Sequence, residues 1–227
     1  MLDTPPEVLY RDEWLLAVDK PVGIIVHGDG VGSDTLTDEL IEWGVVYGRE
    51  AQDLQALQRL DADTSGIVLF SLNKEAQPLF DRMIAERRIS KRYRAIATGL
   101  IAPDTLDIRK PIGRDRHDSR KMRVSPTGKP AHTTVHVLKR LAADDICQTR
   151  TSIAIDLHTG RKHQIRVHMA SMQHPLLGDR LYGRGALSGT DSHDLMLHAS
   201  RIYLEHPITH DRIDITAPLP HRFDPLL

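Results

Sequence analysis

Short apolar runs in the first third of the chain predict buried strands. Leu15–Val18 and Ile24–Val26 are two such runs, and Pro21 and Gly23 between them supply turn chemistry, so we predict two strands around a turn. Ile67–Phe70 is a third apolar run and predicts another buried strand.

Two segments instead have apolar residues at helical spacing. Residues 33–44 predict a helix that ends at Gly44. Residues 73–90 predict a second helix, with Asn73 as its candidate N-cap. Pro78 lies within this second pattern, so we expect the helix to begin late or to kink there.

The second half of the chain alternates apolar and polar residues, which predicts strands. The segments are residues 91–99, 132–141, 148–160, 162–172 and 195–208. The second and third of these predict a hairpin, and in the fourth a period of two places Gln164, Arg166 and His168 on one face. Residues 113–130 are rich in glycine, proline and basic residues and predict a long exposed loop.

The predicted strands outnumber the helices and mostly follow one another as hairpins. This pattern indicates an α+β protein with a mostly antiparallel central sheet, flanked by helices and long loops. The length of 227 residues fits one large domain or two small ones. Because the chain has no internal repeat, low-complexity tract or clear linker, we expect one domain over residues 1–227.

Composition indicates a soluble protein of a reducing compartment. No stretch approaches the roughly 18 apolar residues of a membrane span, and Pro5 and Pro6 interrupt an acidic N-terminus that does not resemble a signal peptide. The single cysteine, Cys147, cannot form an internal disulfide, and we interpret it as a small buried apolar residue. We therefore expect a cytoplasmic protein, and a monomer because no exposed apolar stripe stands out.

Charge is distributed unevenly along the chain. Residues 1–58 contain 12 acidic and 3 basic side chains, whereas the remaining residues contain 19 acidic and 27 basic ones. Residues 82–130 alone contain 14 basic and 5 acidic side chains. This asymmetry is expected when one surface meets a polyanion such as a nucleic acid, although charges that interleave in space would cancel.

An acid pair, Asp61 and Asp63, stands directly before the predicted strand Ile67–Phe70. The spacing Asp-x-Asp-x-Thr also opens the active site of haloacid-dehalogenase-type phosphatases, where the first carboxylate attacks phosphorus. In those enzymes a buried strand precedes the acids, whereas here the strand follows them. A turn in which Asp, Ser and Thr satisfy backbone donors is a further alternative.

Histidines in the segment 158–174 raise the question of a metal site. His163 and His168 are five residues apart on a predicted strand, so they would point to opposite faces. No His-Glu-x-x-His motif accompanies them. We therefore expect no metal site.

The two segments taken together resemble the RluA family of pseudouridine synthases. Residues 59–66 match its Arg-Leu-Asp-x-x-Thr-Ser-Gly signature, and residues 159–168 match Thr-Gly-Arg-x-His-Gln-[IL]-Arg-x-His, followed by His-Pro-[IL]-x-Gly-Asp. Three further stretches agree in the family's order: "DKPVGIIVH", "KRYRAIATG" and "MLHASRIYLEHP". Gln58 departs from the family, which usually has a histidine there, and this puts any role of that histidine in doubt.

The resemblance implies the pseudouridine synthase fold and the isomerisation of uridine in structured RNA. The base would leave C1′, turn and rejoin the ribose through C5, so neither a cofactor nor a metal is required. Large-subunit ribosomal RNA, transfer RNA or both are the implied partners, and no residue decides between them. The resemblance also implies a lone catalytic domain without an S4-like RNA-binding domain ahead of it. A non-catalytic RNA-binding module on the same fold is the alternative that Gln58 suggests.

Three catalytic residues follow from the motif match. Asp61 matches the family's catalytic aspartate, which acts either as a nucleophile at C1′ or as a base on the ribose. Arg166 matches the arginine that pairs with it, and a cation there would keep the carboxylate ionised. Tyr93 matches the tyrosine that stacks on the extruded base and could help to remove the C5 proton.

Four further residues are candidates for substrate binding. Arg59 would bind phosphate or brace the turn, Thr64 would shape that turn, and Lys91 flanks Tyr93 within a basic segment. Leu197 matches an apolar position that the resemblance places against the uracil. The basic segment 113–130 is a candidate clamp on the RNA.

Overall fold

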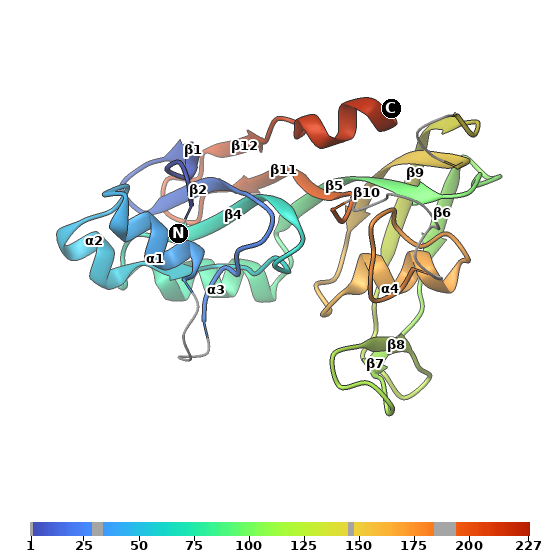
Figure 1. Cartoon of the computed structure of the whole chain (residues 1–227). Helices are drawn as coiled ribbons and strands as arrows, with labels where there is room; N and C mark the ends of the chain where they lie inside the picture. The colour runs from blue at the N-terminus through green and yellow to red at the C-terminus, as the bar shows by residue number, and fades with distance from the viewer. Residues whose placement is uncertain (1, 29–33, 145–147, 184–193) are drawn as a thin grey trace. The chain divides into compact units, whose positions relative to one another are not determined.

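The structure is a computed structural model of the chain that describes residues 2–28, 34–144, 148–183 and 194–227 (Figure 1). Cys147 therefore lies outside the described residues. Contacts group the chain into a first unit, Met1–Ser90 with Ala199–Pro218, and a second unit, Lys91–His198 with Leu219–Leu227. The expectation of a single catalytic domain stays a prediction.

The first unit is built on antiparallel strand pairs. Its strands are β1 (Glu7–Arg11), β2 (Leu15–Lys20), β3 (Gln55–Ala56), β4 (Ser65–Ser71), β11 (Leu197–Glu205) from Ala199 onward, and β12 (Arg212–Thr216). β2 pairs with β1 and β4, β3 pairs with β4, and β12 pairs with β11. Every residue of β4 is buried, so the apolar run that predicted this strand marks the centre of the unit.

The described residues of the first unit form three helices: α1 (Leu36–Glu42), α2 (Gly48–Asp53) and α3 (Gln77–Ala85). α1 begins with a capping box between Thr35 and Asp38, and the chain turns away just beyond it at Gly44, whose φ is 65°. α3 begins late, as predicted, because Pro78 fits only in the first turn of a helix. Asn73 is not its N-cap; its side chain accepts hydrogen bonds in the turn before the helix.

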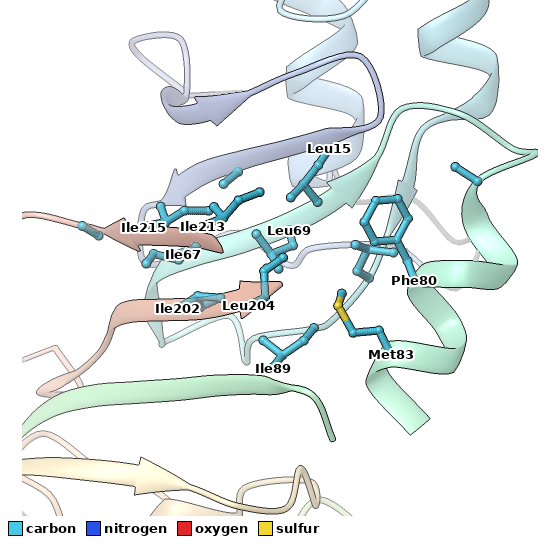
Figure 2. Packing of buried hydrophobic residues seen from close by; sticks show 14 residues of the cluster. Leu15, Ile67, Leu69, Phe80, Met83, Ile89, Ile202, Leu204, Ile213 and Ile215 are labelled. Carbon is cyan, nitrogen blue, oxygen red and sulfur yellow. The ribbon is translucent and has the colours of Figure 1, made fainter. Parts of the chain in front are cut away.

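The core of the first unit forms where α3 meets the strands (Figure 2). Phe80 and Met83 of α3 are fully buried and lie beside Leu69 of β4. Ile202 of β11 and Ile213 of β12 belong to the same cluster. The helical spacing of apolar residues in α3 thus corresponds to one buried face.

Within the residues that the structure describes, the second unit has four antiparallel strands in the order β5-β10-β9-β6, a separate hairpin and two short helices. The strands are β5 (Ile89–Thr98, from Lys91 onward), β6 (Thr105–Ile108), β9 (Thr133–Leu141) and β10 (Arg150–Leu157). The hairpin is β7 (Ile112–Arg114) with β8 (Met122–Val124), and the helices are α4 (Gln164–Ser171) and the 3₁₀ helix η1 (His221–Leu226). The predicted hairpin of β9 and β10 is confirmed.

One strand prediction and one loop prediction in this part of the fold need correction. Ile24–Val26 forms no strand; only Ile25 makes an isolated bridge, to Thr35. The segment 113–130 is not a plain loop, because it contains most of the β7–β8 hairpin. The hairpin forms because its apolar residues pack in a small cluster with Ala131, Val167 and Tyr182.

Residues 162–172 were predicted as a strand, but most of them form the helix α4. All residues from 164 to 169 are buried, so the alternation of polar and apolar residues does not report exposure here. Gln164, Arg166 and His168 are instead satisfied by hydrogen bonds to distant parts of the chain. Tertiary partners therefore override the local period of two.

The α+β class with a large, mostly antiparallel sheet is confirmed. Within the part of the chain that the structure describes, no helix is long and apolar enough to cross a membrane.

Phe80→Ala is expected to lower the free energy of unfolding by about 3–5 kcal/mol, because it leaves a cavity beneath α3. The matched control is Leu79→Ala on the same helix, since Leu79 is 43% exposed and Phe80 is 0% exposed. The control should change stability by about 0.5 kcal/mol or less. Urea unfolding of both variants checks this, and equal losses would contradict the packing described.

Candidate active site

Asp61 lies in a tight turn immediately before β4. The backbone N–H of Thr64 donates to the carbonyl oxygen of Asp61 at 3.0 Å, which closes the turn. Thr64 and Ser65 are buried, whereas Asp61 remains partly exposed. A carboxylate-bearing residue thus stands at the entrance of a fully buried strand.

Lys20 restrains this turn through hydrogen bonds to main-chain carbonyl oxygens. Its side chain is fully buried, and its ammonium donates to the carbonyl oxygens of Pro21, Ile24 and Ala62 at 2.8, 2.7 and 3.1 Å. The backbone N–H of Gly23 also donates to Ala62 at 2.9 Å. Ala62 directly follows Asp61, so these bonds restrain the turn. Lys20 was not among the predicted site residues, although a lysine that ends an apolar strand and precedes a proline is a usable signal.

Gly66 allows the backbone of Ala199 to pack close to the strand that follows the turn. Its φ is 111°, and a Cβ atom there would lie 2.4 Å from the carbonyl oxygen of Ala199. Only glycine fits such a backbone and such a contact. Gln58 donates from Nε2 to the carbonyl oxygen of Ile67 at 3.2 Å, so the residue that replaces the family's usual histidine also supports β4. Arg59 is exposed beside the turn.

Arg166 lies in the second unit, on α4, and forms a buried ion pair with Asp179. Its Nε and Nη2 donate to Oδ2 and Oδ1 of Asp179 at 2.9 and 2.8 Å, and the two side chains are only 3% and 0% exposed. Such a two-pronged pair fixes the plane of the guanidinium as well as its position.

Asp179 receives two further hydrogen bonds from the backbone. The N–H groups of Leu181 and Tyr182 donate to its Oδ1 at 3.0 and 3.1 Å. The carboxylate is thereby held from both sides, as a buried charge requires. Asp179 was not among the predicted site residues, although it is the aspartate of the Gly-Asp pair that ends the second family motif.

Tyr93 is buried on β5 with its neighbours pointing the other way. It faces Ile155 of β10 in the strand register and is 6% exposed. Arg92 next to it binds Asp156 with two hydrogen bonds, at 2.8 and 3.1 Å. Burial lowers the pKa of Lys91 to about 8, so this lysine loses its charge at a lower pH than a solvent-exposed one.

The predicted site residues fall in both units. Asp61, Arg59 and Thr64 belong to the first unit, and the others to the second: Tyr93, Lys91, Arg166 and Leu197. Leu197 is buried at the start of β11. The pairing of Arg166 with Asp61 stays a prediction.

Of the two histidines considered for a metal, His163 lies immediately before α4 and His168 lies within it, so they are not on opposite faces of a strand. Both ring nitrogens of His168 are engaged, with Thr133 and with the carbonyl oxygen of Lys110, and burial lowers the pKa of His168. His163 hydrogen-bonds through Nδ1 to the hydroxyl of Tyr182 at 2.7 Å. Among the described residues, no three His, Cys, Asp or Glu side chains gather as a metal site.

A sequence model of the RNA pseudouridylate synthase family matches residues 14–171. The chain belongs to this family. The matched region includes the turn that carries Asp61, the strand that carries Tyr93 and the helix that carries Arg166. Membership of this family excludes the alternative of a haloacid-dehalogenase-type phosphatase. The predictions that the chain belongs to the pseudouridine synthases and that it is an RNA-isomerising enzyme are confirmed.

Curated relatives agree with this assignment. The chain is 35% identical over 215 residues to the uncharacterised RNA pseudouridine synthase YhcT of Bacillus subtilis, which covers 94% of this chain and 68% of that protein. It is 36% identical over 231 residues to the ribosomal large subunit pseudouridine synthase D of Vibrio vulnificus, with 96% and 68% covered.

Solved structures of the same family have the same fold. Human RNA pseudouridylate synthase domain containing 1 superposes with a TM-score of 0.78 at 27% identity, covering 94% of this chain and 83% of that one. Human RNA pseudouridylate synthase domain containing 4 gives a TM-score of 0.76 at 25% identity, with 96% and 90% covered.

Asp179→Asn is expected to lower the free energy of unfolding by about 3–5 kcal/mol, because it leaves the buried guanidinium of Arg166 without its counter-charge. The matched control in the same unit is Asp156→Asn, which breaks the two-pronged pair with Arg92. Since Asp156 and Arg92 are 28% and 48% exposed, that loss should be about 1 kcal/mol or less. Denaturant unfolding compares the two; similar losses would mean that burial of the Arg166 pair is not decisive.

Proposed function

We propose that Asp61 is the catalytic carboxylate and that it acts on the ribose of a uridine extruded from structured RNA. The turn that holds Asp61 carries this proposal: it lies in the family signature, is only partly buried, and is restrained by Lys20 and by the close packing at Gly66. A restrained carboxylate can be held at the geometry that a reaction at C1′ needs. The two roles, nucleophile at C1′ or base on the ribose, remain alternatives.

Arg166 is the proposed partner of Asp61. Its pair with Asp179 uses Nε and Nη2. We propose that the same guanidinium also donates to the carboxylate of Asp61. A guanidinium keeps its charge when buried, and a direct charged donor favours the ionised form of a carboxylate. Asp179 would then act by fixing the plane in which Arg166 reaches Asp61.

The reaction exchanges one bond to C1′ for another. The bond from C1′ to N1 breaks, the base turns, a bond from C1′ to C5 forms, and the proton that leaves C5 is balanced by one gained at N1. Atoms and electrons are conserved, so the chemistry needs no oxidant, reductant or metal. Tyr93 is the proposed platform for the extruded base, since aromatic rings stack on bases of any sequence, and Leu197 is the proposed apolar contact to the uracil.

The hairpin β7–β8 and its flanks are the proposed RNA contact. Exposed basic residues cluster along it: Arg114, Arg116, Arg120, Arg123 and Lys129. Phosphate contacts of this kind bind RNA with strong salt dependence. Lys91 and Arg59 would add phosphate contacts near the reacting nucleotide, and Thr64 would hold the turn. Large-subunit ribosomal RNA is one proposed substrate, because a relative bears that target in its name; transfer RNA is the other. The proposed setting is a monomer in the cytoplasm.

Asp61→Asn is expected to reduce isomerisation by about 10³-fold or more, because it removes the charge that acts on the ribose. The matched control is Asp63→Asn, two residues away in the same exposed turn and at a variable position of the motif. The control should retain activity. Tritium release from RNA labelled at C5 of uridine, tested with ribosomal and transfer RNA, measures both.

Two outcomes would decide between the proposal and its alternative. Comparable turnover by Asp61→Asn would refute the catalytic role of this carboxylate. Wild-type protein that binds both RNA classes without any tritium release would favour a non-catalytic RNA-binding module. Binding of Asp61→Asn should stay within about threefold of wild type, because the phosphate contacts are unchanged.

A further inference from the structure

Tyr182 lies between the buried ion pair and the basic hairpin. Its ring packs against the guanidinium of Arg166, with 5.3 Å from the guanidinium carbon to the ring centroid. Its hydroxyl accepts a hydrogen bond from the backbone N–H of Met122, the first residue of β8, at 2.8 Å. The same hydroxyl hydrogen-bonds to Nδ1 of His163, immediately before α4.

The backbone around Tyr182 explains how one residue reaches both places. The N–H of Tyr182 donates to Oδ1 of Asp179, and the N–H of Gly183 donates to the carbonyl oxygen of Asp179 at 2.8 Å. A Cβ atom at Gly183 would lie 2.5 Å from that carbonyl oxygen, so a side chain there would force the turn open. This turn therefore holds the carboxylate of Asp179 and the ring of Tyr182 against the same guanidinium.

The hairpin β7–β8 is short. It consists of two three-residue strands, and its apolar residues share a small cluster with Tyr182. The N–H of Met122 is used for the bond to Tyr182, so the tyrosine hydroxyl takes one backbone position of β8 as its partner. Removal of that hydroxyl would leave the N–H of Met122 without this acceptor.

We propose that Tyr182 is a positioning residue that couples the position of the basic hairpin to the orientation of the Arg166 guanidinium. The hydroxyl sets the hairpin through Met122, and the ring sets the guanidinium through the cation–π contact. RNA that contacts the hairpin would therefore be held in a fixed position relative to the guanidinium of Arg166, the proposed partner of Asp61. This inference rests on the proposed function, since it takes the hairpin as an RNA contact and Arg166 as the partner of Asp61.

The two halves of the proposal separate by substitution in the full chain. Tyr182→Phe removes the hydroxyl and keeps the ring, so the Kd for structured RNA should rise roughly three- to tenfold while the single-turnover rate at saturating RNA stays at the wild-type value. Tyr182→Leu removes both, so the saturated rate should also fall, by about tenfold. Tyr182→Met replaces the leucine variant if that variant does not fold. Tyr203→Phe, on an exposed tyrosine, is the matched control and should change neither quantity.

Hydrogen exchange tests the link without RNA. The amide of Met122 should exchange faster in Tyr182→Phe than in wild type, because its acceptor is gone. Unchanged exchange at Met122, or a Tyr182→Phe variant whose saturated rate falls while its Kd does not, would overturn the inference. Its failure is distinct from failure of the proposed function, because the latter appears as absent turnover by the wild-type protein.

Discussion

The second unit is organised around the buried ion pair of Arg166 and Asp179. A guanidinium that is almost without solvent contact needs a counter-charge, and Asp179 supplies it through two hydrogen bonds. The counter-charge comes from the Gly-Asp turn, and the ring of Tyr182 from the same turn covers the guanidinium. The polar residues of α4 follow the same logic, since Gln164 and His168 are buried with partners from other elements. A helix can therefore be polar in sequence and still lie inside the unit.

In the first unit, contacts to the backbone restrain the turn that carries Asp61. A buried lysine binds three carbonyl oxygens around the turn, and a glycine lets the backbone of Ala199 approach the strand that follows. Both contacts fix the main chain close to Asp61, and a fixed main chain is one condition for a preorganised site.

Sequence patterns predicted those elements whose periodicity reports burial. The buried run of β4, the single apolar face of α3 and the hairpin of β9 and β10 are of this kind. The pattern gave a wrong prediction at α4, because buried, hydrogen-bonded polar residues alternate there with apolar ones as they would in a half-exposed strand. It also gave a wrong prediction at β7–β8, where a small apolar cluster orders a segment rich in loop-forming residues.

The predicted site residues came from the match of motifs. Lys20, Asp179 and Tyr182 were not predicted. The partners that give Lys20 and Tyr182 their roles lie 42 and 60 residues away along the chain, whereas Asp179 stood within a motif that had been matched.

A crystal structure with an RNA whose target uridine cannot react tests the central claim most directly. A carboxylate oxygen of Asp61 should then lie within about 3.5 Å of the ribose of an extruded nucleotide, and Arg166 should donate to that carboxylate while it still binds Asp179. An extruded ribose that contacts other residues, with Asp61 and Arg166 beyond hydrogen-bonding distance of each other, would contradict the account.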